Sequence, residues 1–516
     1  MAQPTPQSGA PTAGGQQTEL VKALGLFDST MIVVGSMIGS GIFIVSADIV
    51  HQVQSPGLLL AVWLASGVMT LIGALTYGEL AAAMPHAGGQ YVYLRESLGP
   101  LWGFLYGWTM LLVIQTATIA AVSIAFAKFT AVMIPWFSAS SWILKVGTFG
   151  PWHFWFGSLG PYNVGLNRQN LLGILSIILL TWINTRGLRV GKIVQNIFTV
   201  AKIGALALLV IVGLWFSTSI ARAANFHDFW RNAGLGILHA YPPDAPTWWI
   251  ATITLVGVAM VGSLFSMDAW NNITFTAAEV RNPSRNLPLS LAFGTGIVVL
   301  LYMLANIAYL NVLPLSGDPH GATALARGIE FAADSRVATA VIEVIIGPAG
   351  AIVMAIAILI SGFGCNNGLI LSGARIYYAM AKDGLFFKSV GKVNRHHAPS
   401  VALIVQCIWT CLLCLSGSYS QLLDFLIFAV MIFYILTFVG LFILRWKRPD
   451  MPRPYKAWGY PVLPALYLVM AVFVEIQLLR YKPQYTWPGL IIVLLGVPVY
   501  FLWRWAGNSQ GNRESA

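Results

Sequence analysis

Long apolar runs recur along this chain, and each is about as long as the hydrocarbon layer of a bilayer is thick. Runs of roughly 17 or more apolar residues can cross that layer as a helix. Only 9% of the 516 residues are charged, whereas soluble domains average about 25%. The sequence therefore predicts an all-α membrane protein with twelve transmembrane helices, approximately at 28–50, 57–83, 99–134, 169–185, 193–216, 250–278, 288–313, 347–380, 400–416, 421–445, 460–480 and 487–506.

The distribution of basic residues predicts how these helices are oriented. If both termini are cytoplasmic, 19 of the 29 Lys and Arg residues fall on the inner side and 8 on the outer side. Cytoplasmic loops carry the excess of positive charge in membrane proteins, so we expect both termini in the cytoplasm. These loops would face anionic lipid headgroups, which accounts for the net charge of +11 without a nucleic acid partner.

The ends of the chain and its cysteines indicate no further chemistry. Residues 1–25 are expected to be a disordered cytoplasmic tail, because the first 20 contain neither a basic residue nor the apolar core of a signal peptide. Residues 507–516 are expected to be a second cytoplasmic tail. The four cysteines fall inside predicted helices, so we expect packing roles and neither a disulfide, a metal site nor a cofactor; they are Cys365, Cys407, Cys411 and Cys414.

The first predicted helix is interrupted at its middle by Gly39-Ser40-Gly41. Glycine lowers helix stability and lets the backbone approach another group closely. A break inside a membrane is tolerated only where it is buried in protein or lines a cavity, and broken helices near the midplane bind substrate in many transporters. The spacing of Gly35 and Gly39 also fits close helix packing. This segment alone leaves both interpretations open.

A second interruption follows five helices later, in the run FSMDAWNN at 265–272. It places Ser266, Asp268 and two asparagines in an otherwise apolar span. An ionisable group at membrane depth usually faces a cavity or a partner. Breaks in corresponding positions of two halves are typical of transporters built from inverted repeats, so the spacing suggests two units of five helices.

Motifs in several helices together resemble the amino acid–polyamine–organocation superfamily and its L-amino acid transporter branch. They are GSMIGSGIF (35–43), YGEL (77–80), MPHAGGQY (84–91), WNN (270–272), AEVRNPSRNLPL (278–289), KRPDMPRPY (447–455) and YTWPG (485–489). The resemblance implies a LeuT-like fold with broken helices one and six. Its first inverted repeat would span 26–216, its second 245–446, and helices eleven and twelve would lie peripherally at 458–506.

The resemblance also implies a permease that moves L-amino acids across the plasma membrane by alternating access. The N-terminal end of a half-helix has unpaired amides that suit a carboxylate, and the C-terminal end has carbonyls that suit an ammonium. We expect the substrate carboxylate at Ser40, Gly41 and Ile42. The substrate ammonium is expected at Met37, Ile38, Phe265, Ser266 and Asp268, with Phe265 also serving as an aromatic gate.

Lys202 lies about ten residues inside the fifth predicted helix, too deep to reach an interface easily, so it needs buried acceptors. In the resembling branch, the matching lysine takes the place of the sodium ion of sodium-coupled relatives and contacts helices one and eight. In this chain, the eighth predicted helix could supply acceptors for Lys202 from Ser361 and from Asn366 or Asn367. We therefore expect sodium-independent exchange or facilitated transport. Proton-coupled symport with a preference for cationic amino acids is the alternative, and a lysine reaching the cytoplasmic interface is the alternative for Lys202.

Three acidic residues have structural interpretations beside functional ones. Glu79 and Glu279 lie near the cytoplasmic ends of helices two and six and are expected to form gate ion pairs with Arg95, Arg281, Arg285 or Arg375. Asp268 could select cationic side chains. It could instead form a hydrogen bond to the backbone or to Asn271 and stiffen the break.

Other classes of function find little support in the sequence. No cluster of nucleophile, base and metal ligands indicates an enzyme, and the polar residues do not form the repeated rings of a channel. No cysteine lies between 135 and 167, where eukaryotic relatives bridge to a glycoprotein, so we expect no disulfide-linked heavy subunit. The expected partners are an L-amino acid and membrane lipid, and the expected location is the bacterial inner membrane.

Overall fold

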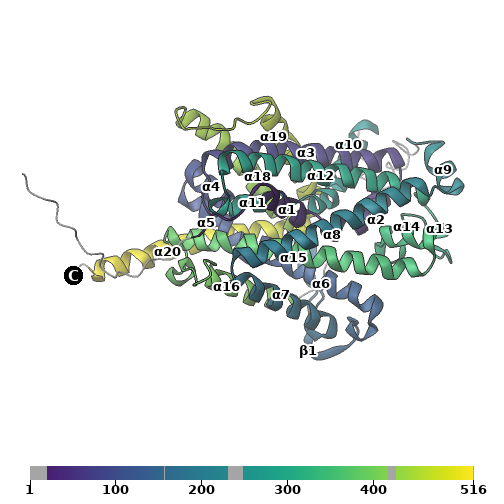
Figure 1. The fold of residues 1–516 in the computed structure, drawn as a ribbon, viewed down its shortest axis with the longest axis horizontal. Helices are drawn as coiled ribbons and strands as arrows, with labels where there is room; N and C mark the ends of the chain where they lie inside the picture. Colours follow the sequence, from purple (N-terminus) through teal and green to yellow (C-terminus); the bar gives the residue numbers. More distant parts are fainter. Residues whose placement is uncertain (1–19, 156, 231–247, 416–425, 515–516) are drawn as a thin grey trace, which may run out of the picture.

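Helices running along the long axis of the molecule make up almost all of the structure (Figure 1). The computed structural model describes residues 20–514, except 156, 231–247 and 416–425. Within these residues, eight helices are long and apolar enough to cross a membrane, or nine if α1 and α2 form one bent span. This architecture confirms a helical chain with many spans. The number twelve stays a prediction.

Nine α-helices lie among the described residues up to 230. They are α1 (Leu26–Met37), α2 (Gly41–Val53), α3 (Pro56–Ala83), α4 (Gln90–Leu98), α5 (Pro100–Thr109), α6 (Gln115–Met133), α7 (Arg168–Thr185), α8 (Leu188–Trp215) and α9 (Ser219–Phe226). The second half begins with α10 (Trp248–Ser266). The remaining helices are α11 (Asn272–Phe275), α12 (Pro283–Val312), α13 (Ala324–Arg327), α14 (Val337–Ile346), α15 (Ala349–Lys382), α16 (Ser400–Cys414), α18 (Leu426–Lys447), α19 (Val462–Tyr481) and α20 (Pro483–Glu514).

Two of the helical segments are much longer than a bilayer requires. A π-helical turn, η1 (Met110–Ile114), joins α5 to α6, and together they form a segment of 34 residues. The helix α15 also has 34 residues. At 1.5 Å per residue, each is about 50 Å long. These segments coincide with the two longest apolar runs of the sequence, predicted at 99–134 and 347–380.

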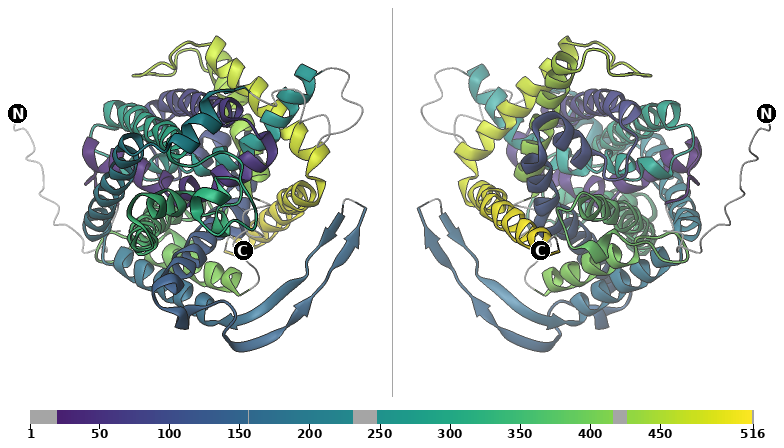
Figure 2. Two further views of the ribbon diagram at one scale, coloured as in Figure 1. Left: turned by 90° about the vertical axis from the view of Figure 1, so that its right-hand side faces the viewer. Right: turned by 90° about the vertical axis from the view of Figure 1, so that its left-hand side faces the viewer.

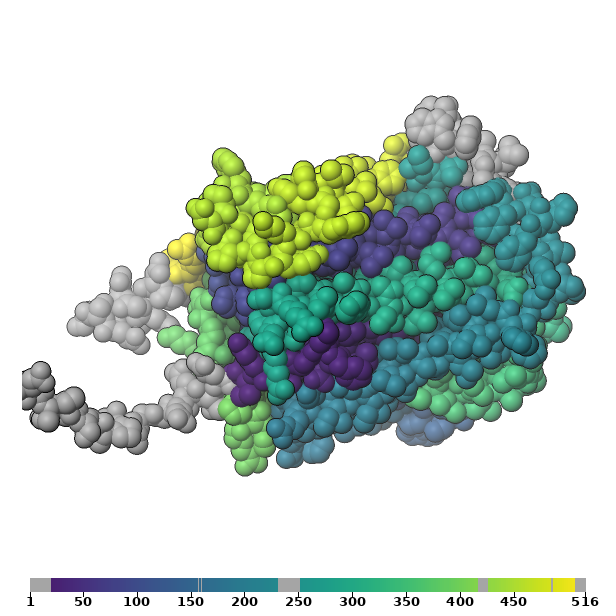
Figure 3. Space-filling model, turned by 45° about the horizontal axis from the view of Figure 1, so that its top comes forward, coloured from purple at the N-terminus to yellow at the C-terminus, as the bar shows by residue number. Residues whose placement is uncertain are grey.

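The broken first helix lies in the interior of the bundle. All residues from Ser29 to Met37 are buried, against α8, α12 and α15. Protein therefore covers the part of α1 that leads to the break. By contrast, α19 lies on the surface beside α3, as the yellow and dark blue segments of Figure 3 show.

A β-hairpin between α6 and α7 is the main departure from the all-α prediction. The strand β1 (Trp142–Phe149) pairs antiparallel with β4 (Tyr162–Asn167), and β2 (Trp152–Phe154) pairs with β3 (Gly157–Leu159). Figure 2 shows the hairpin, in blue, curving outside the helices. Aromatic and β-branched residues favour strands, and this segment is rich in both. Two of its tryptophans, Trp152 and Trp155, are exposed, and Trp155 packs on Trp487 with ring centroids 4.4 Å apart.

Candidate functional site

The first helix breaks where the sequence predicted. The helix α1 ends at Met37, α2 begins at Gly41, and their axes differ by 41°. Ile38 has an extended backbone, and Ser40 precedes the first residue of α2 as its N-cap. The amides of Gly41 and Ile42 begin a helix and so lack acceptors from a preceding helical turn, whereas Phe43 N donates to Ser40 O at 3.2 Å. They therefore form a short site of positive potential in the interior of the bundle.

The second break separates α10, which ends at Ser266, from the four-residue helix α11, which begins at Asn272. Ala269, inside the break, has a φ of 66°, a conformation that residues other than glycine rarely adopt. Asp268 N donates to Phe265 O at 3.1 Å and closes the end of α10. The sequence signal for this break was weaker because no glycine or proline lies inside it.

The two breaks meet directly. A Cβ atom placed on Gly41 would lie 2.3 Å from Ser266 Oγ and 2.9 Å from Ser266 Cβ. The N-terminal end of α2 therefore touches the C-terminal end of α10, and only glycine leaves room for this contact. Opposite ends of two helix dipoles lie side by side, an arrangement that complements a zwitterion with one charge of each sign.

Lys202 connects α8 to the first break. Its ammonium donates to Gly35 O at 2.6 Å, to Ile38 O at 2.8 Å and to Ser361 O at 3.2 Å. The side chain is only 1% exposed. An ammonium has three donors, so these three carbonyls satisfy it completely.

The residues around Lys202 differ from the expected set. Ser361 accepts from it through its carbonyl and uses its own hydroxyl to donate to Ile38 O and Gly39 O. Asn366 and Asn367 bond elsewhere: Asn366 donates to Ser123, and Asn367 donates to Gly191 and Gln195. Neither asparagine therefore has a recorded hydrogen bond with Lys202 among the described residues.

Two carbonyls that were expected to bind the substrate ammonium already accept two hydrogen bonds each. Ile38 O accepts from Lys202 and Ser361. Met37 O accepts from Gly39 N at 2.9 Å and from the Tyr302 hydroxyl at 3.2 Å. A carbonyl oxygen has two lone pairs, so neither is open in this conformation. Phe265 O, which accepts only Asp268 N outside its own helix, lies at the second break and keeps acceptor capacity there.

Asp268 forms one of the two hydrogen bonds that the sequence suggested: its carboxylate accepts from the backbone amide of Ala269, but Asn271 is not its partner. Asp268 Oδ1 accepts from the Tyr434 hydroxyl of α18 at 2.6 Å. Asn271 instead donates to Gln90, at 2.9 Å. Asp268 also lines a small cavity beside Tyr106 and Leu369. A carboxylate that accepts two hydrogen bonds has about four lone-pair positions, so Asp268 keeps acceptor capacity at the cavity wall.

Two buried glutamates close the end of the bundle at which α1 begins. Arg375 donates to both oxygens of Glu279, at 2.8 and 3.0 Å. Glu79 accepts from Arg445 at 2.9 and 2.5 Å, and Arg453 lies 3.2 Å from it. Arg375 was among the expected partners. The partners of Glu79 were not, because they follow the tenth helix and only the fold brings them to α3.

Three tyrosines that the sequence analysis did not single out also contact the breaks. The Tyr302 hydroxyl donates to Met37 O, and the Tyr309 hydroxyl donates to Ile42 O at 3.2 Å. Both lie on α12, seven residues apart, so they share one face of that helix. Tyr434 holds Asp268. A polar hydroxyl repeated at helical spacing inside an apolar span is the signal that could have identified the first two.

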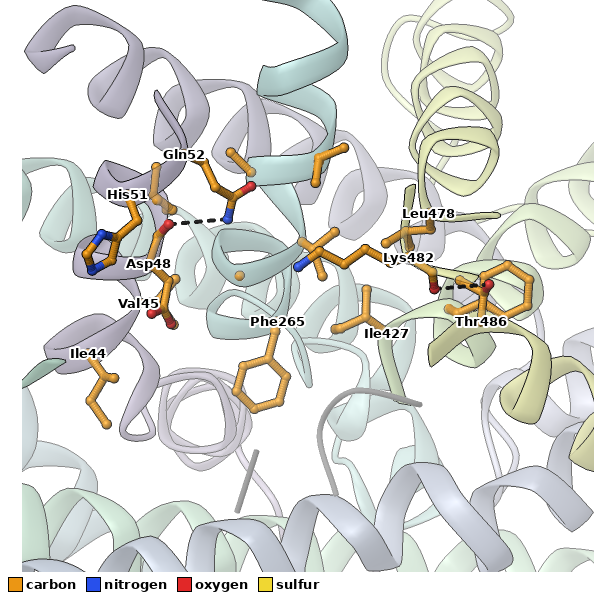
Figure 4. Close-up of a pocket in the computed structure, with 16 residues that line it drawn as sticks. Ile44, Val45, Asp48, His51, Gln52, Phe265, Ile427, Leu478, Lys482 and Thr486 are labelled. Atoms are coloured by element: carbon orange, nitrogen blue, oxygen red, sulfur yellow. Dashed lines mark hydrogen bonds between the residues drawn. The ribbon is translucent and has the colours of Figure 1, made fainter. Parts of the chain in front are cut away.

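A larger cavity lies on the other side of Phe265 (Figure 4). Its volume is about 400 Å³, and its walls come from α2, α10, α18, α19 and α20. Phe265 lines this cavity, whereas Asp268, three residues farther along the chain, lines the two small ones. The role of Phe265 as an aromatic gate stays a prediction. The residues that line the larger cavity are Ile44, Val45, Asp48, Ile49, His51, Gln52, Val258, Ala259, Val261, Gly262, Phe265, Ile427, Phe428, Leu478, Lys482 and Thr486.

Two broken helices that meet in the interior of a membrane bundle define a transporter of small solutes. Comparison with known proteins identifies the class further: residues 24–499 match the family model described as amino acid permease. The chain belongs to this family. It is therefore a multi-pass membrane protein that carries amino acids, and membership confirms a transporter in place of an enzyme.

The chain is also similar to individual animal transporters along most of its length. It is 32% identical to the large neutral amino acids transporter small subunit 2 of Mus musculus over 492 residues, which are 95% of this chain and 82% of the relative. It is 32% identical to the Homo sapiens protein of the same name, over 96% of this chain and 83% of the relative. It is 28% identical to the human b(0,+)-type amino acid transporter 1, over 94% and 88%.

We predict that Gly41→Ala weakens amino acid binding at least tenfold, about 1.4 kcal/mol, while the protein stays folded. The added methyl would push Ser266 away and open the contact between the two breaks. Alanine favours a helix more than glycine does, so lost helix propensity cannot explain a loss. Equilibrium binding of a labelled amino acid to detergent-solubilised protein measures the effect. Gly41→Ala/Ser266→Gly should recover part of the affinity, and normal binding by the single variant would contradict the site.

The buried pair of Arg375 and Glu279 generates a second prediction. Removing one partner of a buried pair costs roughly 3–5 kcal/mol, whereas an exposed pair contributes about 0–1 kcal/mol. Arg375→Met should therefore lower the thermal unfolding midpoint of the purified protein far more than Arg448→Met. Arg448 is the matched control because it pairs with Glu96 at 3.1 Å with its side chain 54% exposed, against 1% for Arg375. Equal losses would show that the buried pair has no special structural role.

Proposed function

We propose that this chain is a sodium-independent exchanger of L-amino acids in the bacterial inner membrane, with both termini in the cytoplasm. The names of its relatives support the substrate class, since they are transporters of amino acids. The excess of basic residues in the loops on the side of the termini supports the orientation. Its central site lies where α2 begins and α10 ends.

The observation that carries this proposal is the position of Lys202. A sodium ion in a protein needs several oxygen ligands, and the exposed carbonyls of a broken helix could supply them. Here the ammonium of Lys202 already occupies Gly35 O, Ile38 O and Ser361 O. An ammonium held at this point occupies these ligands and supplies the positive charge that a sodium ion would bring.

The substrate is proposed to bind across the two breaks. Its carboxylate would accept from the amides of Gly41 and Ile42, with Ser40 beside them, because they lie at the positive end of α2. Its ammonium would lie near the C-terminal end of α10, at Phe265 and Ser266. Lys202 adds positive charge close to the carboxylate side of this site.

Alternating access is supported by the asymmetry of the structure. The ion pairs of Glu279 with Arg375 and of Glu79 with Arg445 close the cytoplasmic end. The cavity beyond Phe265 lies toward the other end. We propose that transport breaks these ion pairs when the outer side closes, which would make Glu79 and Glu279 inner gate residues.

The chain is proposed to work without a disulfide-linked heavy subunit. The Mus musculus relative is named a small subunit, a name that refers to an assembly. This chain has no cysteine between residues 135 and 167, and its four cysteines lie in α15 and α16. A covalent link to a partner outside the membrane would have no thiol to use at those positions.

A counterflow assay with the full chain in liposomes tests the proposed function. Liposomes loaded with an unlabelled amino acid should accumulate the labelled one transiently, and the accumulation should saturate with concentration. A channel would equilibrate the label without accumulation. Absence of any amino acid flux would contradict the proposal.

Lys202→Met should reduce this exchange at least tenfold, which corresponds to about 1.4 kcal/mol. The variant removes one donor from each of three carbonyls in the interior of the membrane, where each lost hydrogen bond is costly, and Ile38 O keeps only the Ser361 hydroxyl. Lys128→Met is the matched control, because Lys128 is exposed on α6 and should tolerate the change. Comparable losses in the two variants would exclude a special role for Lys202.

Asp268 provides the test of substrate charge. If its carboxylate faces the substrate side chain, a fixed negative charge favours lysine, arginine or ornithine. Asp268→Asn should then weaken competition by these amino acids at least tenfold, roughly 1.4 kcal/mol, with little effect on leucine. Tyr434→Phe is the control, because it removes the hydrogen bond but keeps the charge. Equal losses for both classes would mean that Asp268 binds the common ammonium or supports the break.

A further inference from the structure

The outer cavity carries two charges of opposite sign on facing walls. Asp48 lies on α2, and Lys482 lies between α19 and α20. Figure 4 shows the Lys482 side chain extending across the cavity toward the wall that α2 forms. Within the described residues, neither the Asp48 carboxylate nor the Lys482 ammonium has an ion pair.

The other polar side chains of this cavity are uncharged or already paired, although Gln52 Oε1 has no hydrogen-bond partner within the described residues. His51 lies 3.6 Å from Glu330 and packs on Phe331 with ring centroids 5.3 Å apart. Gln52 donates to the backbone oxygen of Asp48 at 3.2 Å. The Thr486 hydroxyl donates to the carbonyl of Lys482 at 3.3 Å. Asp48 and Lys482 are therefore the charges that a molecule in the cavity would meet.

The rest of the lining is apolar, and it leads to Phe265. Val258 and Val261 of α10 and Ile427 of α18 form much of it, with Phe265 toward the interior. A cavity of about 400 Å³ lies within the range of small-molecule sites, roughly 300–1,000 Å³. Apolar walls with a few converging polar groups are typical of such sites.

This cavity is distinct from the central site. Asp48 lies seven residues beyond Gly41 on the same helix, which places it about 10 Å farther along the axis at 1.5 Å per residue. Phe265 lines the outer cavity, and the next residue, Ser266, contacts Gly41 at the central site. An amino acid moving inward from the outer side would therefore meet the charges of Asp48 and Lys482 first.

We propose that the outer cavity is a second binding site for a zwitterionic amino acid. Its carboxylate binds Lys482, its ammonium binds Asp48, and an apolar side chain packs against Ile427 and Phe265. One fixed charge of each sign on facing walls complements both charges of a zwitterion. A simple cation or a simple anion would be attracted by one wall and repelled by the other. The inference rests on the proposed function, because it takes the same substrate class.

Binding stoichiometry of the purified full chain tests the proposal, with labelled leucine measured by equilibrium dialysis. The wild type should bind two molecules per chain. Lys482→Met and Asp48→Asn should each bind one, held at the central site. Gly41→Ala should also bind one at the outer site, and Gly41→Ala/Lys482→Met should bind none at the same concentrations.

Matched controls separate the site from general effects of charge. Arg480→Met removes a neighbouring positive charge of α19 that does not line the cavity, and it should keep two bound molecules. The exchange Asp48→Lys/Lys482→Asp should restore the second molecule, because it keeps one charge of each sign. Leucinol, which lacks the carboxylate, should not compete at the outer site of Gly41→Ala.

The outcomes distinguish this inference from the function on which it rests. One bound molecule in the wild type, unchanged in Lys482→Met and Asp48→Asn, overturns the outer site and leaves the carrier intact. Two molecules in all variants also overturns it. No binding and no exchange by the wild type contradicts the proposed function itself.

Discussion

The ammonium of Lys202 is the contact on which the rest of the interior depends. Breaking a helix inside a membrane leaves carbonyls without partners, and hydrocarbon offers no water to satisfy them. Lys202 reaches from α8 to two such carbonyls of the first break and to one of α15. The Lys202 ammonium nitrogen therefore connects α1, α8 and α15, which are distant in sequence. The break costs less because its carbonyls are paired, and the buried charge costs less because it is surrounded by oxygen.

Close approach of the second break follows from this arrangement. With the end of α1 held by Lys202, the start of α2 is free to face Ser266 at the end of α10. Tyr302 and Tyr309 of α12 support the same segment through Met37 O and Ile42 O. The result is a polar point inside an apolar bundle that offers amides on one side and carbonyls on the other. Such a point recognises the part that all amino acids share, and it leaves the side chain to neighbouring residues such as Asp268.

Local sequence predicted the features that depend on local chemistry. The break at Gly39-Ser40-Gly41 lies where the glycines are, and the two longest runs form the two longest segments. The depth of Lys202 in an apolar run indicated buried acceptors, because no interface was within easy reach. These properties depend on backbone flexibility and hydropathy, which a single sequence contains.

Features that depend on distant contacts were missed. Arg445 and Arg453 reach Glu79 only after 366 and more residues of chain have folded. Tyr434 reaches Asp268 across a separation of 166 residues, so the nearby sequence indicated the backbone partner of Asp268 but not this one. The occupied state of Met37 O and Ile38 O depends on Tyr302, Lys202 and Ser361 together. The hairpin after α6 was also missed, since its aromatic residues fit an interfacial loop equally well.

The central claim is that Lys202 supplies the cation that sodium would otherwise provide, and the affinity for substrate with and without sodium tests it most directly. The dissociation constant of a labelled amino acid should be measured for the purified wild type in sodium chloride and in choline chloride at equal ionic strength. The two values should agree. A clearly tighter dissociation constant in sodium would contradict the claim, because it would require a sodium site that the ammonium of Lys202 does not replace.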